Sequence, residues 1–169
     1  MNIELMLKAG KDATPEERAA FKELVLRDPQ VDPKGLSGRI AQAYLLAFLY
    51  KDGELIATGA IKNNSWHQEH VAEDAGVPLP SAEYLGEVGY IHTAEGHRRH
   101  GHGDRVLASL AEAAGGKELF ATIQSKNKLS QRLLARNGYV RVGKSWPSNR
   151  VDDRVNLYIR PKAAPKAGG

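Results

Sequence analysis

The chain has 169 residues, of which 41% are hydrophobic and 26% charged, and this balance is typical of a globular domain that buries its own core. It contains no cysteine, which excludes disulfides, thiolate metal sites and a cysteine nucleophile. The formal net charge of +4 favours anionic partners, either nucleic acid or a phosphorylated small molecule.

The sequence predicts a protein of the cytoplasm with no membrane attachment. Its start, MNIELMLKAG, lacks a basic segment followed by a long apolar run, and no stretch reaches the roughly 18 apolar residues of a membrane helix. We expect a single domain over residues 1–160. A flexible tail should follow over residues 161–169, where Pro, Ala, Gly and Lys predominate.

The first third of the chain predicts a strand, a helix and a hairpin in this order. The segment IELMLKA alternates loosely, as strands do. Thr14, Pro15 and Glu17 then combine a capping box with proline at the first helical position. Two strand-like runs follow, AYLLAFLY and ELIATGAI, and the Asp52-Gly53 pair between them favours a tight primed turn.

Residues 63–82 are polar and contain two prolines, which predicts an excursion from the sheet with a short helix from His67 to Ala75. His67 and His70 stand three apart, a spacing that suits two metal ligands on a helix, but no third ligand accompanies them and a solvated face is favoured. The acidic residues of the segment could attract a cationic amine or simply face solvent, and the second interpretation is slightly favoured. These acidic residues are Glu69, Glu73 and Asp74.

The second half of the chain predicts strands at YLGEVGYIHTA, ELFATIQ, YVRVGKSW and RVNLYIR. A helix is expected after Gly103, with an apolar face between Val106 and Ala114. Another helix is expected over NKLSQRLLARNG, with Asn127 as its cap and Leu129 and Leu133 on one face. Strands and helices in this order predict a mixed α/β fold with one central sheet.

The segment HRRHGHG lies between an expected strand and an expected helix. Gly101 and Gly103 let backbone N–H groups turn inward, and the following helix adds the positive end of its dipole. With the charge of Arg98 and Arg99, these features form a site suited to phosphate. Asp104 lies near the helix start, where a carboxylate is also favoured.

Three other interpretations of this segment are weaker. A metal would need ligands from His97, His100 and His102, whose spacing is irregular and which no carboxylate cluster accompanies. A nucleic acid would favour aromatic residues interleaved with the basic ones, and no known reader motif is present. A solvated basic loop is the third interpretation, and the wider sequence makes it less favoured.

Two short motifs stand in order in the second half. Arg98, Gly101 and Gly103 fit the pattern Arg/Gln-x-x-Gly-x-Gly/Ala, and NKLSQRLLARNGYVRVG follows downstream. Through both motifs, the chain resembles the GNAT superfamily of acetyl-CoA-dependent N-acetyltransferases over about residues 40–160. In that family the first motif holds the pyrophosphate of coenzyme A, and the second is an Asn-x-x-Ala/Ser-x-x-Leu helix followed by Gly-Phe/Tyr. The residues that match the second motif are Asn127, Ser130, Leu133, Gly138 and Tyr139.

The resemblance implies a GNAT-like fold, with a central, mostly antiparallel mixed sheet of about seven strands flanked by helices. It also implies acetyl-CoA as cosubstrate and no metal. In the family the pantetheine arm lies between the splayed fourth and fifth strands, so the backbone of Ile91, His92 and Thr93 is expected to contact it. The loop and the second motif supply the other expected cofactor-binding residues, which are Arg98, Arg99, His100, Gly101, His102, Gly103, Asp104, Asn127 and Ser130.

Glu87 is the candidate general base. A histone-acetylating branch of the family carries its catalytic glutamate at the same offset, eleven residues before the loop arginine Arg98. Glu83 is a weaker substitute. His92 could act as base or proton relay, although a packed or solvent-facing side chain is favoured for it.

The resemblance supplies no proton donor for the departing thiolate. Many family members carry a tyrosine seven residues after the Asn of the second motif, and Leu134 occupies that position here. Tyr139 is expected to pack in the core, and Tyr90 is left open. Water or another group would then protonate the thiolate, and an inactive, cofactor-binding relative also stays open.

The sequence therefore predicts an N-acetyltransferase that transfers an acetyl group from acetyl-CoA to an amine. The amine could belong to a protein, a small molecule or an aminoacyl-tRNA, and nucleic acid is expected as a partner only in the last case. The alternative is a non-catalytic acetyl-CoA-binding or RNA-associated module that uses the same basic loop. No membrane partner is expected, and a homodimer is left open.

Overall fold

The computed structural model describes residues 2–161, so most of the predicted tail, from residue 162 onward, lies outside the described residues. The chain divides into two compact units. The first consists of Met1–Asn64 and Gly86–Ala113, and the second of Ser65–Leu85 and Ala114–Gly169.

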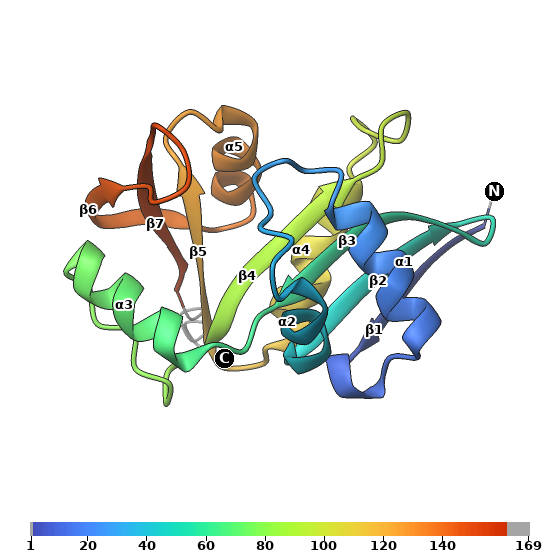
Figure 1. Ribbon diagram of the computed structural model, residues 1–169, viewed down its shortest axis with the longest axis horizontal. Helices are drawn as coiled ribbons and strands as arrows, with labels where there is room; N and C mark the ends of the chain where they lie inside the picture. The colour runs from blue at the N-terminus through green and yellow to red at the C-terminus, as the bar shows by residue number, and fades with distance from the viewer. Residues whose placement is uncertain (1, 162–169) are drawn as a thin grey trace, which may run out of the picture. The chain divides into compact units, whose positions relative to one another are not determined.

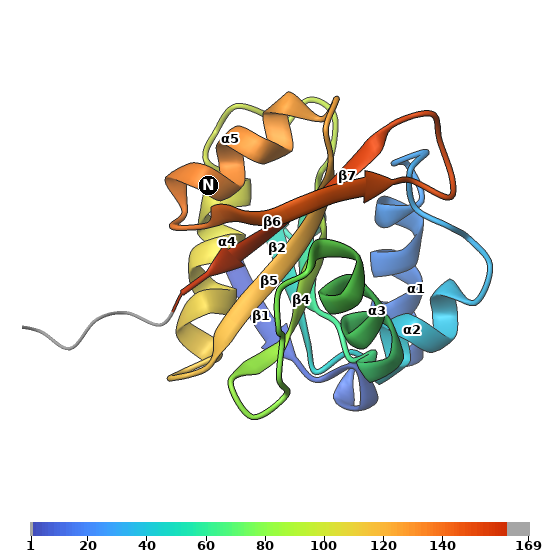
Figure 2. The ribbon, with the colours of Figure 1, turned by 90° about the vertical axis from the view of Figure 1, so that its left-hand side faces the viewer.

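The first unit is built on four antiparallel strands in the order β1, β2, β3, β4 (Figure 1). Helices α1 and α2 cover one face of these strands, and α4 covers the other (Figures 1 and 2). Strand β4 begins two residues before the unit does. The elements are β1 (Ile3–Lys8), a 3₁₀ helix (Gly10–Asp12), α1 (Pro15–Val25), α2 (Leu36–Gln42), β2 (Leu45–Lys51), β3 (Glu54–Ile61), β4 (Tyr84–Thr93) and α4 (His102–Ala113).

Two local signals in this unit act as the sequence predicts. The Glu17 N–H donates to Thr14 Oγ1 over 3.1 Å, while the Thr14 N–H donates to Glu17 Oε1 over 2.8 Å, which completes the capping box of α1. Asp52 and Gly53 have φ values of 50° and 84°, as the central residues of a primed hairpin turn require.

Helix α2 is absent from the sequence prediction. It has only seven residues, and its N-cap is Gly35, which makes no side-chain capping hydrogen bond. Leu36 and Ile40 stand one turn apart on its buried side and are almost fully inaccessible to solvent. Burial of these two side chains against α1 and the sheet, rather than helix propensity, stabilises α2.

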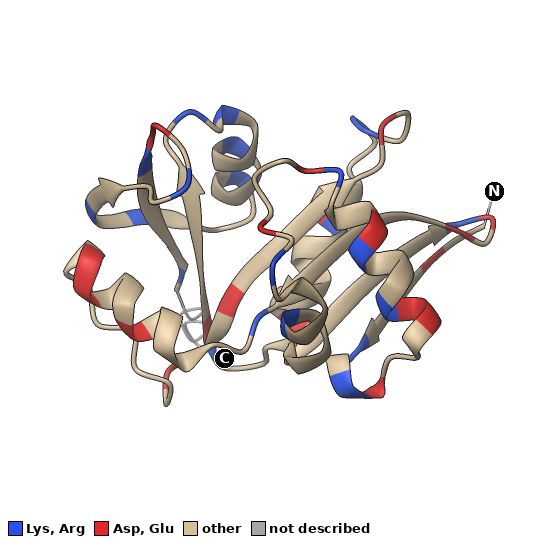
Figure 3. Ribbon diagram, viewed as in Figure 1, with Lys and Arg blue, Asp and Glu red and all other residues tan. Residues whose placement is uncertain are grey.

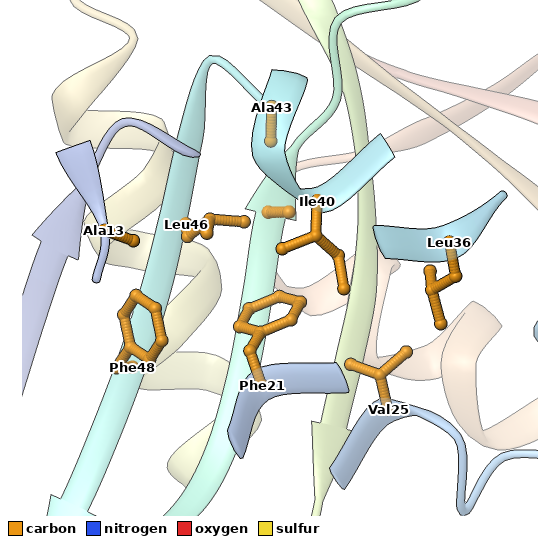
Figure 4. Packing of buried hydrophobic residues seen from close by; sticks show 9 residues of the cluster. Ala13, Phe21, Val25, Leu36, Ile40, Ala43, Leu46 and Phe48 are labelled. Atoms are coloured by element: carbon orange, nitrogen blue, oxygen red, sulfur yellow. The ribbon is translucent and has the colours of Figure 1, made fainter. Parts of the chain in front are cut away.

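The core between α1, α2 and the sheet is a compact apolar cluster, whose side chains from the helices and from β2 face one another (Figure 4). The rings of Phe21 and Phe48 meet edge to face with centroids 5.5 Å apart. Partly buried Tyr90 of β4 packs at its margin. The fully packed residues of this cluster are Ala13, Phe21, Val25, Leu36, Ile40, Ala43, Leu46, Phe48 and Ala60.

The second unit contains three antiparallel strands in the order β5, β7, β6, and α3 packs against β6 and β7. Its buried residues include Val71, Phe120 and Leu157. Helix α3 begins at Ser65, two residues earlier than predicted. The elements are α3 (Ser65–Ala75), β5 (Glu118–Gln124), α5 (Lys128–Arg136), β6 (Val140–Pro147) and β7 (Arg154–Arg160).

The leucines of α5 differ in burial, and Leu129 is 77% exposed. Leu134 is the buried leucine of this helix. The Gln131 side chain donates to the carbonyls of Gln124 and Ser125 at the end of β5, so the helix presents the Gln131 and Leu134 side to the rest of the unit. The sequence predicts that Leu129 and Leu133 share a face, and it does not show which leucine of the helix is buried.

The described residues form seven strands and five α-helices, and every strand pair resolved within either unit is antiparallel. The predicted α/β class is therefore confirmed. Between residues 2 and 161, no helix is both long enough and apolar enough to cross a membrane.

Candidate active site

The loop after β4 adopts the glycine-dependent backbone that the HRRHGHG motif predicts. Gly96 and Gly101 have φ values of 89° and 77°, and Arg99 between them has a φ of 67°. The first helical hydrogen bond of α4 runs from the Arg105 N–H to the Gly101 carbonyl over 3.1 Å. The helix begins at His102, so the last two residues of the motif, His102 and Gly103, belong to its first turn.

This loop has room for a ligand against its backbone. A β-carbon added to Gly101 would meet no other atom within 4 Å. Arg98 and Arg99 are exposed, and the Arg98 Nε–H donates to the Thr93 carbonyl over 3.1 Å, which holds its guanidinium near the end of β4. Backbone N–H groups at the start of α4 and two guanidinium groups thus lie in one short segment, as an anion site needs.

The charged form of His102, at the start of α4, is disfavoured. Burial lowers the pKa of His102 below its ordinary value, and the neighbouring His100 and His97 lower it further. The ring centroids of His100 and His102 are 6.0 Å apart. Among residues 2–161, no group of three His, Asp or Glu side chains is placed to hold a metal ion.

Strand β4 carries a bulge at Tyr90. Ala60 pairs with Gly89 and Thr58 pairs with His92, so β4 has one residue more than β3 between these pairs. Tyr90 has a φ of 53°, a backbone conformation that costs energy for any residue except glycine. The Thr58 hydroxyl donates to the Tyr90 carbonyl over 2.8 Å and fixes the bulge.

The bulge determines which way the end of β4 faces. A side chain at Gly59 would collide with Ile91, Val106 and Leu110, so Ile91 lies on the α4 side of the strands. The Tyr90 ring lies on the other side, edge to face with Phe21 of α1 at a centroid distance of 6.2 Å.

His92 follows the bulge and is half-buried. Burial and the charge of Arg98 lower the pKa of His92, so the ring is neutral near pH 7. Its Nε2 atom is buried and has no hydrogen-bond partner among the described residues.

Glu87 is the one acidic residue of β4, seen as the red segment of that strand in Figure 3. It is buried, with 5% of its surface exposed. Lys62 Nζ lies 3.3 Å from Glu87 Oε1 and 4.4 Å from the centroid of the Tyr90 ring. Burial alone would lower the pKa of Lys62, but the Glu87 carboxylate and Tyr90 raise it above its ordinary value, so Lys62 is a cation.

Arg39 of α2 also contacts Tyr90, the residue whose ring faces Lys62. Its Nε–H donates to the Tyr90 hydroxyl over 3.1 Å. Its two terminal nitrogens donate to the carbonyls of Asp32 and Lys34 over 2.6 Å each, which ties the segment before α2 to the bulge. Sequence reasoning missed both Lys62 and Arg39, because only the pairing of β3 with β4 and the packing of α2 bring them to Glu87 and Tyr90.

Residues 11–139 match the model of the acetyltransferase (GNAT) family. The chain belongs to this family. It is an acyltransferase of the type that the sequence predicted, and the family uses acetyl-CoA.

Solved structures of GNAT-type proteins share the fold at low sequence identity. An acyl-CoA N-acyltransferase from Pseudomonas aeruginosa matches with a TM-score of 0.69 and 17% identity, over 95% of this chain and 100% of that one. ElaA from Escherichia coli matches with a TM-score of 0.70 and 14% identity, over 95% and 100%. YncA from Salmonella typhimurium, solved with its cofactor acetyl-CoA, matches with a TM-score of 0.63 and 17% identity, over 99% of each chain. No match was found among curated protein sequences.

The second GNAT motif lies in the second unit and has a clear structural role there. Asn127 caps α5, its side chain accepting a hydrogen bond from the Ser130 N–H over 3.2 Å, as the sequence predicts for a cap. The contacts of Asn127 and Ser130 with the cofactor stay predictions.

Neither Leu134 nor Tyr139 suits the role of the tyrosine acid that many GNAT members carry. Leu134, at the tyrosine position, is 3% exposed and has no proton to give. Tyr139 packs in the core as predicted, and burial raises the pKa of its hydroxyl well above the ordinary value, which makes it a weaker acid.

Five side chains of the second unit that were weighed as a base, a metal ligand or amine-attracting groups face solvent instead. Glu83, the substitute base, is exposed. His70 stacks on the exposed Trp66 with ring centroids 3.8 Å apart, and its Nδ1 lies 2.8 Å from the Trp66 carbonyl. The acidic positions of α3, red in Figure 3, are exposed, which supports the solvated-face interpretation of Glu69, Glu73 and Asp74.

Proposed function

We propose that the protein transfers the acetyl group of acetyl-CoA to the nitrogen of a primary amine. The observation that carries this proposal is the loop from Arg98 to Gly103, where a positive-φ glycine with open space around it stands between two exposed arginines and a helix start. Phosphate oxygens fit such a loop because they accept hydrogen bonds from backbone N–H groups and guanidinium groups.

In this proposal the first unit orients the cosubstrate. Arg98, Arg99 and the N–H groups at the start of α4 bind its phosphates, with His100, His102 and Asp104 around them. Backbone groups at the end of β4, from Ile91 to Thr93, contact the pantetheine arm, whose thioester carries the acetyl group.

Glu87 takes the proton of the acceptor amine. An amine attacks only when it is neutral, and a free lysine amine has a pKa near 10.4, so a base is needed at pH 7. The buried carboxylate, 3.3 Å from Lys62 Nζ, would accept this proton directly or through water. The nitrogen then bonds to the thioester carbon, the carbon–sulfur bond breaks, and the thiolate takes a proton from water, since Leu134 cannot supply one.

Binding and turnover test the proposal separately. Titration calorimetry should detect acetyl-CoA binding, and poly-U should not compete for it. A panel of amines is then screened by following the free thiol released from acetyl-CoA. Binding without thiol release for any amine would favour the non-catalytic module, and salt-sensitive binding of poly-U alone would favour an RNA-associated one. Location in the cytoplasm, a homodimer and a tRNA substrate stay predictions.

A further inference from the structure

Glu87, Gly89 and Tyr90 form a small cage around the ammonium group of Lys62, and we call these three residues the ammonium cage. The carboxylate of Glu87 lies 3.3 Å from Lys62 Nζ, and the Tyr90 ring centroid lies 4.4 Å from it. A carboxylate and an aromatic face are the two groups with which proteins bind an alkylammonium ion.

Gly89 provides the room in which the lysine arm lies. A β-carbon at this position would stand 2.5 Å from Lys62 Cε and 2.9 Å from Nζ, so any larger residue would fill the space of the terminal methylene and the ammonium. The cage therefore fits an unbranched –CH₂–NH₃⁺ group closely.

Hydrogen bonds hold Tyr90 in the cage, whereas the side chain that occupies the cage is partly exposed. The Tyr90 backbone is held by Thr58, and its hydroxyl is held by Arg39. Glu87 is 5% exposed, while the Lys62 side chain, which follows the last residue of β3, is 30% exposed. Lys62 is thus the more exposed partner of the pair, and hydrogen bonds hold both the backbone and the hydroxyl of Tyr90.

We propose that the ammonium cage binds the ammonium group of the acceptor amine, and that Lys62 occupies it in the free protein as a tethered competitor. The inference rests on the proposed function, in which Glu87 accepts the proton of that amine. It names the acceptor class as primary amines at the end of an unbranched methylene chain. Except in glycine, an α-amine carries a branched carbon next to nitrogen, and this branch would collide with the strand at Gly89.

The first experiment measures binding without acetyl transfer. The K62A variant opens the cage, and n-propylammonium chloride is the probe, titrated by NMR and by thermal unfolding at constant ionic strength. We expect K62A to bind the probe about tenfold more tightly than the wild type, and its unfolding temperature to rise with probe concentration. The double variant K62A/E87Q should lose this gain, because the carboxylate is gone.

Lys8 offers a matched control. Lys8 Nζ lies 3.0 Å from Glu17 Oε1, and its side chain is 33% exposed, close to the 30% of Lys62. The K8A variant removes a lysine of similar exposure from the ion pair that joins β1 to α1, away from the cage. It should therefore bind n-propylammonium no better than the wild type. Equal gains in K8A and K62A, or no gain in K62A, would overturn the cage.

A second variant guards against a K62A protein that does not fold. K62Q keeps an N–H donor for Glu87 without the charge, and it should bind the probe about threefold more tightly than the wild type. The same affinity as the wild type in a folded K62Q would contradict the competition by Lys62.

The second experiment tests whether the cage binds the acceptor amine during acetyl transfer. Free-thiol release from acetyl-CoA is measured with n-propylamine as acceptor, and we expect the KM for this amine to fall about tenfold in K62A. A gain in probe binding with an unchanged or raised KM would overturn the assignment of the cage to the acceptor. Absence of thiol release from the wild type with every amine would instead defeat the proposed function, and the binding measurement would still report on the cage.

Discussion

The loop from Arg98 to Gly103 and the ammonium cage lie about ten residues apart on one stretch of the first unit, yet they are built in different ways. The loop is exposed, contiguous in sequence, and depends on backbone conformation and two arginines. The cage is built around one buried carboxylate, its occupant Lys62 directly follows β3, and its support Arg39 comes from α2.

Because the loop and the ammonium cage are built differently, we expect them to respond differently to mutation. A contiguous loop that binds phosphates can be removed without disturbing the packed strands, so its loss should change affinity alone. A buried ion pair contributes to stability as well as chemistry, because removing one charge leaves the other without its partner. Variants in each region should therefore separate affinity, turnover and stability.

The largest effect is expected from Glu87→Gln, which removes the proposed general base from the cage and leaves the loop intact. The amide cannot take a proton, so kcat should fall by about 10²–10⁴, while the Kd of acetyl-CoA stays within about twofold. The defect should shrink as pH rises, because more of the amine is then neutral and needs no base.

A pH–rate profile of wild type and Glu87→Gln between pH 6 and 9 measures this effect. Thermal unfolding of the variant shows whether loss of the ion pair to Lys62 affects folding. Wild-type rates across the whole range would remove Glu87 from the mechanism and return attention to His92, whose buried Nε2 has no hydrogen-bond partner within residues 2–161.

Gly101→Val should break the loop and leave the cage intact. Valine is strained at a φ of 77°, and its side chain would stand where the backbone approaches the phosphates. Loss of hydrogen bonds to charged oxygens, each worth roughly 1.5–3 kcal/mol, should raise the Kd of acetyl-CoA about 100-fold or more in titration calorimetry.

Gly96→Val is the matched control for this loop. Gly96 has a φ of 89° and open space around it, but it lies outside the motif. It should carry the same backbone strain and leave acetyl-CoA affinity nearly unchanged. Equal losses in the two variants would show that strain, and not access to phosphate, explains the effect.

Arg98→Ala and Arg99→Ala should each show how much the positive charge of the loop contributes to coenzyme A binding. We expect about a tenfold weaker affinity for coenzyme A, because a guanidinium binds phosphate through charge-assisted hydrogen bonds. A pantetheine fragment without the nucleotide phosphates should be affected less. If both ligands lose affinity equally in calorimetry, the arginines support the fold and do not bind phosphate.

Thr58→Val should have the smallest effect and tests how firmly the bulge is held. The substitution keeps the shape of a fully buried side chain and removes the hydrogen bond to the Tyr90 carbonyl. The free energy of unfolding should fall by about 1 kcal/mol in a urea titration. Thr58→Ser retains the hydroxyl and should preserve the KM for the amine, whereas a lowered KM in both variants would argue against a rigid cage.

The sequence alone determined the parts of this protein that rest on local signals. The capping box of Thr14 and Glu17, the Asp52-Gly53 turn and the glycines of the basic loop each need only neighbouring residues, so each could be predicted. The two GNAT motifs are local in the same sense, and they were sufficient to indicate the family.

Tertiary structure decided what depends on residues distant in sequence. Helix α2 has no capping side chain and forms because Leu36 and Ile40 are buried, and α5 buries Leu134 instead of Leu129 because of its hydrogen bonds to the end of β5. Lys62 meets Glu87 because β3 pairs with β4, and Tyr90 faces α1 because one extra residue in β4 shifts the register. A strand alternates its side chains between two faces, so a single bulge redirects each residue that follows, and only the folded sheet records where that bulge lies.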